Sequence, residues 1–336
     1  MKILLSSHFF HPSVGGIEEV SYNLAHKFFQ LGHEVKVITR TKTKSNIEFP
    51  FEIIRRPTPF QLIHLTRWCD VFFHNNISLK TAWPLLFIRK PWVVAHHTWI
   101  ARMNGRINLR DRIKQWICKY ATNISISKVM SKHLRVPSII IGNPYRNQVF
   151  KLDPTAKREQ DLVFLGRLVW DKGVDLLLDA LFILKTRGIT PRLTIIGNGP
   201  EQASLEQQCA RLELNNQVNF CGTHTAENLA AMLNSHKIIV IPSRWQEPFG
   251  LVALEGIACG CVAIGAECGG LPDAIGSGGI LFPYGETEPL AQAIETLLGN
   301  ESMQAQYRQA AAEHLSQYTS IEVAKKYLKV LKKVAQ

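Results

Sequence analysis

Two carboxylates eight residues apart are the first candidates for chemistry in this chain. Glu247 is followed directly by Pro248-Phe249-Gly250-Leu251, and Glu255 comes four residues after that segment. An apolar run, Ile238 to Ile241, precedes Glu247 and small residues follow Glu255, which predicts a strand, a loop and a buried helix. In an open α/β sheet such a loop lies at the carboxyl end of its strand, where ligands bind.

The start of this helix is a candidate anion site. The backbone N–H groups of Phe249, Gly250 and Leu251 would be the unpaired donors of a helix N-terminus, which bind anionic oxygens. Glu255 lies about two turns beyond Glu247 and could reach a second part of the same ligand. Together these groups describe a sugar-nucleotide site. One carboxylate would bind sugar hydroxyls, the helix terminus would bind phosphate, and the second carboxylate would bind a ribose. The simpler alternative is a helix that carries two solvated glutamates.

These residues also carry a resemblance to a known family. Glu-x-Phe-Gly, with a glutamate four residues beyond Gly-Leu, resembles the signature of the family-four retaining glycosyltransferases, of the glycosyl transferases group 1 type. The resemblance implies the α/β GT-B architecture, in which two Rossmann-like doubly wound domains face each other across a cleft. It also implies transfer of a hexosyl unit from UDP- or GDP-hexose to an acceptor hydroxyl, with retention at the anomeric carbon. Glu247 would then orient the sugar rather than act as a covalent nucleophile, and Glu255 would hold the ribose.

Two cations follow the first predicted strand of the second half. Gly166-Arg167-Leu168 with Lys172-Gly173 resembles the Gly-Arg-Leu and Lys-Gly pattern of the family, which implies that Arg167 and Lys172 neutralise the diphosphate. Arginine offers phosphate a bidentate fork, and lysine offers it a point charge. Two solvated surface cations are the alternative. Because the chain has no Asp-x-Asp motif, we expect the cations to replace a divalent metal and catalysis to need no cofactor.

Three weaker candidates lie elsewhere in the chain. Gly15 and Gly16 stand between the first strand and the first long helix, where paired glycines let the backbone approach a diphosphate. His97 ends a strand, and the resemblance implies that it lies over the reacting sugar; a histidine satisfied within its domain is the alternative. His224, in a loop after a strand, is the expected contact for the base. The Gly197-x-Gly199 turn is interpreted as mainly structural.

Charge is distributed unevenly along the chain. The 336 residues carry a net charge of +12, but residues 1–150 hold 22 Lys and Arg against 7 Asp and Glu, and the remainder holds 17 against 20. A half this basic implies a polyanionic partner: a phospholipid surface, a lipid diphosphate or nucleic acid. Motifs for stacking RNA bases, zinc spacings and helix-turn-helix signals are absent from the sequence, so nucleic acid ranks last.

A basic amphipathic helix is predicted over residues 108–119. Its apolar side and its cationic side, together with Arg102 and Arg106, could rest on anionic lipid or grip an acceptor phosphate. The alternative is an ordinary half-buried helix with a solvated face. The basic character of the N-terminal half keeps the membrane interpretation open.

Strand and helix patterns alternate in both halves. A helix with one apolar face is predicted from Ile17 to Leu31, ended by Gly32, and another from Gly173 to Thr186. Such alternation predicts doubly wound, mostly parallel sheets. The predicted strands cover residues 2–7, 34–39, 51–55, 70–74, 92–95, 123–126 and 138–140, then 162–165, 192–196, 218–220, 238–241 and 261–265.

We therefore expect two domains. Residues 1–145 would form an acceptor-binding domain and residues 146–319 a nucleotide-sugar-binding domain, with a break around Gly142-Asn143-Pro144 and a linker in the charged stretch that follows, residues 151–160. The resemblance implies that the terminal helix, residues 320–336, returns to the first domain. Apolar runs are strand-sized, well short of the ~20 residues that span a bilayer, and the N-terminus is interpreted as a strand rather than a signal peptide. Seven cysteines without framework spacing suggest buried thiols in a reducing cytoplasm.

The expected function is that of a cytoplasmic hexosyltransferase that builds cell-surface glycans or glycolipids, peripheral on the inner face of the membrane if the basic helix binds lipid. Its acceptor would be a glycan or a lipid-linked intermediate. A sugar-nucleotide epimerase of the same architecture is one alternative, although it would be expected to lack the Gly-Gly turn and the Glu247 and Glu255 pair. A catalytically silent binding subunit is another, although it would be expected to lose Glu247 or the phosphate cations.

Overall fold

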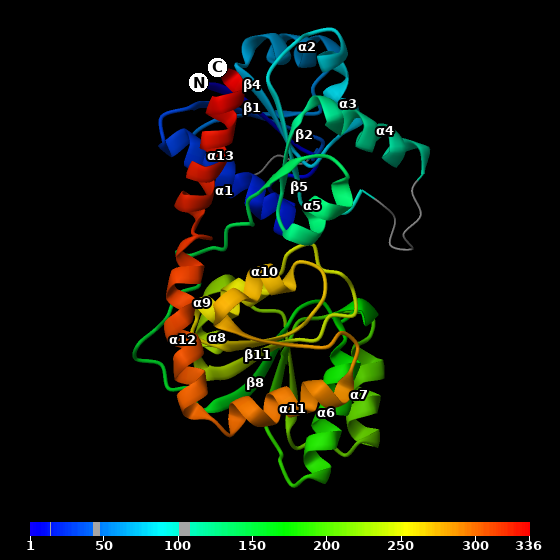
Figure 1. The fold of residues 1–336 in the computed structure, drawn as a ribbon, viewed down its shortest axis with the longest axis vertical. Helices are drawn as coiled ribbons and strands as arrows, with labels where there is room; N and C mark the ends of the chain where they lie inside the picture. Colours follow the sequence, from blue (N-terminus) through cyan, green and yellow to red (C-terminus); the bar gives the residue numbers. More distant parts are fainter. Residues whose placement is uncertain (14, 43–47, 101–107) are drawn as a thin grey trace. The chain divides into compact units, whose positions relative to one another are not determined.

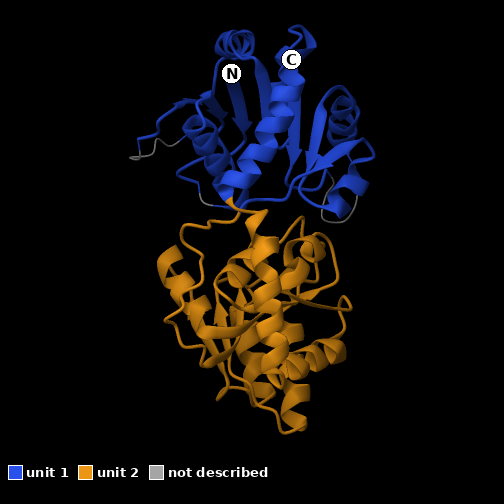
Figure 2. Ribbon diagram, turned by 60° about the vertical axis from the view of Figure 1, so that its left-hand side comes forward, with its two compact units in different colours: residues 1–144, 320–336 blue, residues 145–319 orange. Residues whose placement is uncertain are grey.

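The computed structural model describes residues 1–13, 15–42, 48–100 and 108–336. The chain separates into two compact units, shown in Figure 2: unit 1 is Met1–Pro144 with Ser320–Gln336, and unit 2 is Tyr145–Thr319. The charged stretch of residues 151–160, where the sequence suggested a linker, belongs to unit 2. The backbone N–H of Asp153 donates to Asn234 Oδ1 at 2.8 Å, and Arg158 donates to the carbonyl of Cys259 at 2.6 Å. These bonds fix that stretch against the body of unit 2.

Unit 1 contains a seven-stranded parallel sheet with the order β3-β2-β1-β4-β5-β6-β7. The strand order reverses between β1 and β4, so the carboxyl ends of these two strands form the topological switch point of the sheet. The strands are β1 (Lys2–Ser7), β2 (Glu34–Thr39), β3 (Glu52–Arg55), β4 (Val71–Asn75), β5 (Trp92–His96), β6 (Thr122–Ser125) and β7 (Ser138–Ile140). The helices are α1 (Gly16–Gln30), α2 (Pro59–Trp68), α3 (Leu79–Ala82), α4 (Leu109–Ile117), α5 (Lys128–Leu134) and α13 (Ser320–Ala335), with short 3-10 turns η1 (Trp83–Leu86) and η2 (Cys118–Tyr120).

Local sequence explains where these helices begin and end. Gly32 adopts a φ of +82° just after α1, as expected of a glycine that terminates a helix. Thr58 and Gln61 form a capping box at the start of α2. The last helix, α13, packs beside α1 (Figure 1), and its Tyr327 is fully buried with its ring 5.6 Å from that of Phe73 on β4. The C-terminal segment is therefore part of the core of unit 1.

Unit 2 contains a six-stranded parallel sheet with the order β10-β9-β8-β11-β12-β13, and its switch point lies between β8 and β11. The sequence analysis missed β13, a four-residue edge strand that begins with a glycine. The strands are β8 (Gln160–Leu165), β9 (Leu193–Ile196), β10 (Val218–Gly222), β11 (His236–Ile241), β12 (Val262–Ala266) and β13 (Gly279–Phe282). The helices are α6 (Val174–Thr186), α7 (Gln202–Arg211), α8 (Ala226–Ser235), α9 (Leu251–Ala258), α10 (Leu271–Ile275), α11 (Thr287–Leu298) and α12 (Glu301–Ser316), with 3-10 turns η3 (Trp170–Lys172) and η4 (Gly276–Gly278).

Every strand pair of both sheets is parallel, which confirms the predicted doubly wound α/β class. The seven cysteines are all free, and five of them are buried. In the described part of the chain, no helix combines the length and the apolar character needed to cross a membrane.

Candidate functional site

An ion pair lies at the switch point of unit 2. Lys172 Nζ donates to Glu247 Oε1, and Ser243 Oγ donates to the same oxygen at 2.9 Å. The Lys172 and Glu247 side chains are only 22% and 16% exposed, so water screens their attraction less than it screens a surface pair. Among the described residues none donates to Glu247 Oε2, which leaves that oxygen available to a ligand hydroxyl.

Glycines allow the loops that hold this pair to approach closely. Gly173, directly after Lys172, has a φ of +68°, and a Cβ there would lie 2.1 Å from the carbonyl oxygen of Pro242. Gly269 has a φ of +57°, and a Cβ there would lie 2.3 Å from the carbonyl oxygen of Glu247. The Gly270 N–H donates to that same carbonyl at 2.7 Å. The loops after β8, β11 and β12 therefore fix the two charged side chains together.

The helix that follows Glu247 has the predicted unpaired donors. Its first residue is Leu251, and its N-cap, Gly250, has a φ of +127°, a conformation that favours glycine. No described residue accepts a hydrogen bond from the backbone N–H of Phe249, Gly250 or Leu251. The Phe249 side chain is 2% exposed, with its ring 5.5 Å from that of Tyr318, and so anchors the loop. This helix start can accept an anionic oxygen.

Glu255, the second predicted carboxylate, also belongs to α9 and already has a cationic partner. Arg146 approaches its Oε1 at 3.6 Å, and the Glu255 side chain is 13% exposed. The Arg146 guanidinium also lies 4.9 Å from the centre of the Phe150 ring, a cation–π contact. A ribose hydroxyl that binds Glu255 would therefore meet a carboxylate held in place by an arginine.

The remaining candidates of unit 2 lie at the same carboxyl edge of the sheet. Arg167 follows β8 and is exposed, and no described residue accepts a hydrogen bond from its guanidinium. His224 is also exposed, in the turn between β10 and α8. A Cβ at Gly197 or at Gly199 would lie 1.8 Å or 2.1 Å from a carbonyl oxygen of the loop after β8. Close loop packing is thus a sufficient reason for both of these glycines.

In unit 1, Gly15 is the N-cap of α1 and Gly16 is its first residue. A Cβ at Gly15 would lie 2.5 Å from Glu18 Oε2, so the carboxylate of Glu18 lies against the backbone of this turn. A carboxylate in the first turn stabilises the helix N-terminus. Val14 of the same motif lies outside the described residues.

His97 lies just beyond β5 and is buried within unit 1. Its Nδ1 lies 2.8 Å from Asn143 Oδ1, and its backbone N–H donates to Asn76 Oδ1 at 2.7 Å. Burial lowers the pKa of His97 to about 4, against the opposing effect of the Asn143 hydrogen bond, so the ring is neutral at pH 7. Nδ1 then donates to Asn143, and Nε2 is a buried acceptor that has no hydrogen-bond partner among the described residues. An unpaired buried acceptor favours a ligand contact over a purely structural histidine.

The basic helix predicted over residues 108–119 is formed by α4 and η2. No residue of α4 is fully buried, but Ile117 is half-buried against the core of unit 1, so the alternative of an ordinary half-buried helix with a solvated face stays open. Leu109 and Trp116, on its apolar side, are 73% and 54% exposed. Arg102 and Arg106, which the sequence grouped with this helix, lie outside the described residues.

Sequence reasoning missed the polar partners in these clusters, among them Ser243, Asn143 and Arg146. Ser243 is the second residue after β11, and a polar residue that close to a strand end was the available signal. Asn143 and Arg146 lie in the segment that was interpreted only as a break between domains. Within the described ranges, no group of three or more His, Cys, Asp or Glu residues could hold a metal ion.

Comparison with known proteins assigns the chain to a family. The sequence model of the family described as glycosyl transferases group 1 matches residues 146–314, which include every candidate residue of unit 2. The chain belongs to this family. The resemblance to glycosyl transferases group 1 is thereby confirmed, and the protein is a glycosyltransferase by family.

Relatives along most of the chain agree with this assignment. N-acetyl-alpha-D-glucosaminyl L-malate synthase of Bacillus anthracis is 26% identical over 93% of this chain and 94% of its own. The gpi3 subunit of the phosphatidylinositol N-acetylglucosaminyltransferase of Schizosaccharomyces pombe is 24% identical over 96% of this chain and 79% of its own. Among solved structures, Anabaena HepE in complex with UDP matches with a TM-score of 0.84 at 20% identity, over 99% of this chain and 100% of its own. The fold is GT-B, as predicted.

Proposed function

We propose that this glycosyltransferase moves a hexosyl unit from UDP- or GDP-hexose to an acceptor hydroxyl, with retention at the anomeric carbon and without a metal ion. The observation that carries the proposal is the cluster of Lys172, Glu247 and Ser243 at the switch point of unit 2. It combines a cation for phosphate with a carboxylate oxygen for hydroxyls, beside unpaired N–H groups. HepE binds UDP and, in a further structure, UDP-glucose, which supports this donor class.

Each donor group has a proposed partner in unit 2. Arg167, Lys172 and the N–H groups at the start of α9 would bind the diphosphate. Glu247 Oε2 would accept from sugar hydroxyls, Glu255 from the ribose, and the loop that holds His224 would contact the base. As the glycosidic bond to phosphate breaks, negative charge grows on the leaving diphosphate, and the cations stabilise that charge in the transition state.

Unit 1 is the proposed site of the acceptor. The neutral Nε2 of His97 can accept a hydrogen bond from a hydroxyl group, while Gly15 and Gly16 remain proposed as backbone contacts of the phosphate. The basic character of this half fits an acceptor that carries phosphate, such as a lipid-linked intermediate in the synthesis of a surface glycan. A cytoplasmic enzyme at the inner face of the membrane is part of the same proposal.

A thermal-shift screen against UDP, GDP, ADP and dTDP, with and without EDTA, tests the donor site. A ligand that binds only the folded protein raises the melting midpoint by mass action. We expect a shift with UDP or GDP that EDTA does not change and that Arg167→Ala reduces. The Lys157→Ala variant, which removes an exposed cation of the same unit outside the cluster, is the matched control.

Product analysis separates the proposal from its two alternatives. With a hexose donor labelled at the anomeric carbon, NMR of a transferase reaction shows a new glycoside with the donor's anomeric configuration. An epimerase would instead change the configuration of the sugar without any acceptor. A binding subunit would show the thermal shift and no turnover with any acceptor.

A further inference from the structure

Two exposed aromatic side chains of unit 2 have no role in the donor site as described above. Trp170 is 61% exposed and Tyr284 is 49% exposed. Trp170 begins η3, soon after β8, and Tyr284 follows β13, so both lie in loops at the carboxyl edge of the sheet. Tryptophan is largely buried in most proteins, so a mostly exposed one at a ligand-binding edge is a candidate contact.

Arg244 joins the two aromatic residues. Its guanidinium lies 5.6 Å from the centre of the Trp170 ring, a cation–π contact, and the Tyr284 hydroxyl donates to its backbone carbonyl. Arg244 is itself fixed, because its Nη2 pairs with Asp175 Oδ2 at 2.8 Å and its N–H donates to the carbonyl of Asp171 at 2.9 Å. Both rings are therefore held in place before a ligand binds, which lowers the entropy lost on binding.

The loops that hold this aromatic pair also hold the donor cluster. Trp170 and Lys172 belong to the same short turn, η3. Arg244 directly follows Ser243, whose hydroxyl donates to Glu247. Trp170 therefore stands at the border of the proposed donor site, and a ligand on its ring would lie beside the sugar that is transferred.

The groups around the rings indicate the chemical class of this ligand. An aromatic ring presents a flat apolar face with a negative quadrupole, which attracts C–H groups. Asp171, next to Trp170, is half-buried, and no described residue donates a hydrogen bond to its carboxylate. A pyranose ring has a face of C–H groups and a rim of hydroxyl donors, so it satisfies the ring and the carboxylate together.

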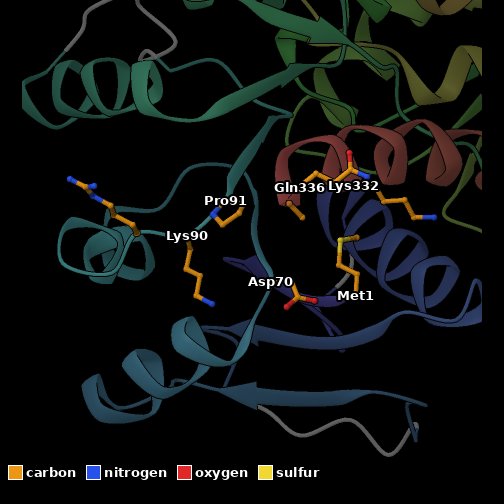
Figure 3. A pocket seen from close by; sticks show the side chains of 8 residues that line it. Met1, Asp70, Lys90, Pro91, Lys332 and Gln336 are labelled. Atoms are coloured by element: carbon orange, nitrogen blue, oxygen red, sulfur yellow. The ribbon is translucent and has the colours of Figure 1, made fainter.

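Charge favours a neutral ligand at the aromatic pair over a phosphate or a lipid headgroup. The guanidinium beside the ring is already paired with a carboxylate, and Asp171 adds a negative charge. The hollow of about 550 Å³ in unit 1 is different, because it is lined by Arg89, Lys90 and Lys332 (Figure 3). Among its described lining residues Asp70 is the one acidic side chain. Anions would prefer a surface of that kind.

Size favours a sugar over a protein partner. A protein interface covers about 800 Å² on each partner. One centred on Trp170 would extend over Lys172 and Arg167 and would close the proposed donor site, whereas a sugar ring needs only the aromatic pair and its carboxylate.

We propose that Trp170 and Tyr284 form a subsite that stacks against a pyranose ring of the acceptor, which is then a glycan. This inference rests on the proposed transfer to an acceptor hydroxyl and names the class of molecule that carries the hydroxyl. The donor base is proposed to lie at the loop after β10, at the opposite end of the sheet from β13, so it does not compete for these rings.

Saturation-transfer NMR with short neutral glycans tests the subsite. The full-length protein with bound UDP is mixed with maltotetraose, cellotetraose or chitotetraose, which differ in linkage but all present C–H faces of pyranose rings. We expect saturation to reach ring C–H protons of at least one of them. Its dissociation constant, measured by titration, should rise about twofold to tenfold in Trp170→Ala and in Tyr284→Ala, the usual range for an aromatic contact.

Further variants separate stacking from other effects. Trp170→Phe keeps a flat ring and should bind nearly as the wild type does. Trp170→Leu is apolar but not flat and should bind as weakly as Trp170→Ala. The matched control is Phe182→Ala, which removes an aromatic ring that is 41% exposed on α6, about two turns beyond the start of the helix, and should change nothing. The melting midpoint of each variant without ligand shows that it is folded.

Two results would overturn the proposal. One is the absence of saturation transfer to all three glycans, or binding that Trp170→Ala leaves unchanged. The other is a UDP thermal shift that is lost in Trp170→Ala but kept in Phe182→Ala, which would mean that the ring binds the donor base. The UDP shift of the wild type tests the proposed function separately. With that shift and no glycan contact, the subsite alone fails, whereas glycan contact without any nucleotide shift would contradict the transfer reaction itself.

Discussion

The two units share a strand order and differ in what they place at the ends of their strands. In both sheets the first strand lies between the second and the fourth, so each has one switch point. Unit 2 has an ion pair there, Lys172 with Glu247. Unit 1 has uncharged histidines at its strand ends, because burial lowers the pKa values of His74, His96 and His97 to about 3, 4 and 4. The shared topology thus gives both units a site at the strand ends, and the side chains there make that site charged in unit 2 and neutral in unit 1.

Net charge alone would place the phosphate site in the N-terminal half of the chain. Residues 1–150 have a large basic excess and the remainder is slightly acidic, yet the phosphate-binding cations proposed here belong to the acidic half. The basic excess of unit 1 lies partly around Arg89, Lys90 and α4, whereas its buried histidines are uncharged. If these cations bind the donor, the net charge of a region does not indicate where its phosphate site lies.

The largest predicted effect is on transfer by unit 2. Lys172→Ala should lower the rate of sugar transfer about a hundredfold to a thousandfold, since it removes a preorganised cation that stabilises the leaving group. Lys185→Ala is the matched control, because Lys185 pairs with a glutamate, Glu213, that is itself 84% exposed. Steady-state release of nucleoside diphosphate measures both. Equal rates for the two variants would mean that the ion pair at the switch point has no special role.

Acid should destabilise unit 1 more than unit 2. A buried histidine with a folded pKa near 4 stays neutral while the unfolded chain binds a proton below about pH 6.5, so the free energy of unfolding falls as the pH drops between these values. Each such group contributes up to about 1.4 kcal/mol per pH unit, and unit 1 has three of them.

Hydrogen exchange at pH 7 and pH 5 measures this difference unit by unit. We expect protection to fall further in unit 1 than in unit 2. In unit 1, His97→Asn should reduce the pH dependence of the free energy of unfolding by the contribution of one bound proton. A parallel loss of protection in both units would contradict the burial argument.

Glycine substitutions should show that the loops around the ion pair are closely fitted. Gly173 and Gly188 both have positive φ, of +68° and +79°, but a Cβ at Gly188 would meet nothing within 4 Å. Gly188→Ala should therefore cost about 1 kcal/mol of unfolding free energy from backbone strain alone. Gly173→Ala should cost about 1–3 kcal/mol more, because the loop carbonyl of Pro242 must move. Denaturant unfolding of unit 2 measures both changes. Equal losses of unfolding free energy in Gly173→Ala and Gly188→Ala would mean that the loops do not fit closely.

The smallest predicted effect is that of a chelator. If Arg167 and Lys172 carry the charge of the diphosphate, then dialysis against EDTA should leave the rate of transfer unchanged. Adding back magnesium or manganese should restore nothing. A loss of activity that either ion reverses would contradict the proposal of metal-free transfer.

The sequence predicted the fold well because periodic patterns report burial directly. The runs around Ile238 and Ile195 are short, β-branched and bounded by glycine or proline, so their strands were recognisable. The edge strand β13 was missed because Gly279 opens it and only one of its four residues is buried. Edge strands carry less of the burial pattern on which such predictions depend.

The sequence predicted some residues of the site but not the residues that hydrogen-bond to them. Glu247 and Lys172 were found from their motifs, but their ion pair depends on the approach of two loops 75 residues apart in sequence. Ser243 was missed because a lone serine after a strand is common. The partner of His97, Asn143, lies 46 residues away in sequence. Hydrogen bonds between distant segments leave no local signal, so only the structure reveals them.

The central claim is that Lys172, held in its cluster with Glu247, binds the diphosphate of a nucleotide-sugar donor. Isothermal titration of UDP and GDP into the wild-type protein, Lys172→Ala and Lys185→Ala, all in EDTA, tests it most directly. A hydrogen bond between charged groups contributes about 1.5–3 kcal/mol, so Lys172→Ala should weaken binding about tenfold to a hundredfold while Lys185→Ala binds as the wild type does. Unchanged affinity in Lys172→Ala would place the diphosphate elsewhere and contradict the account.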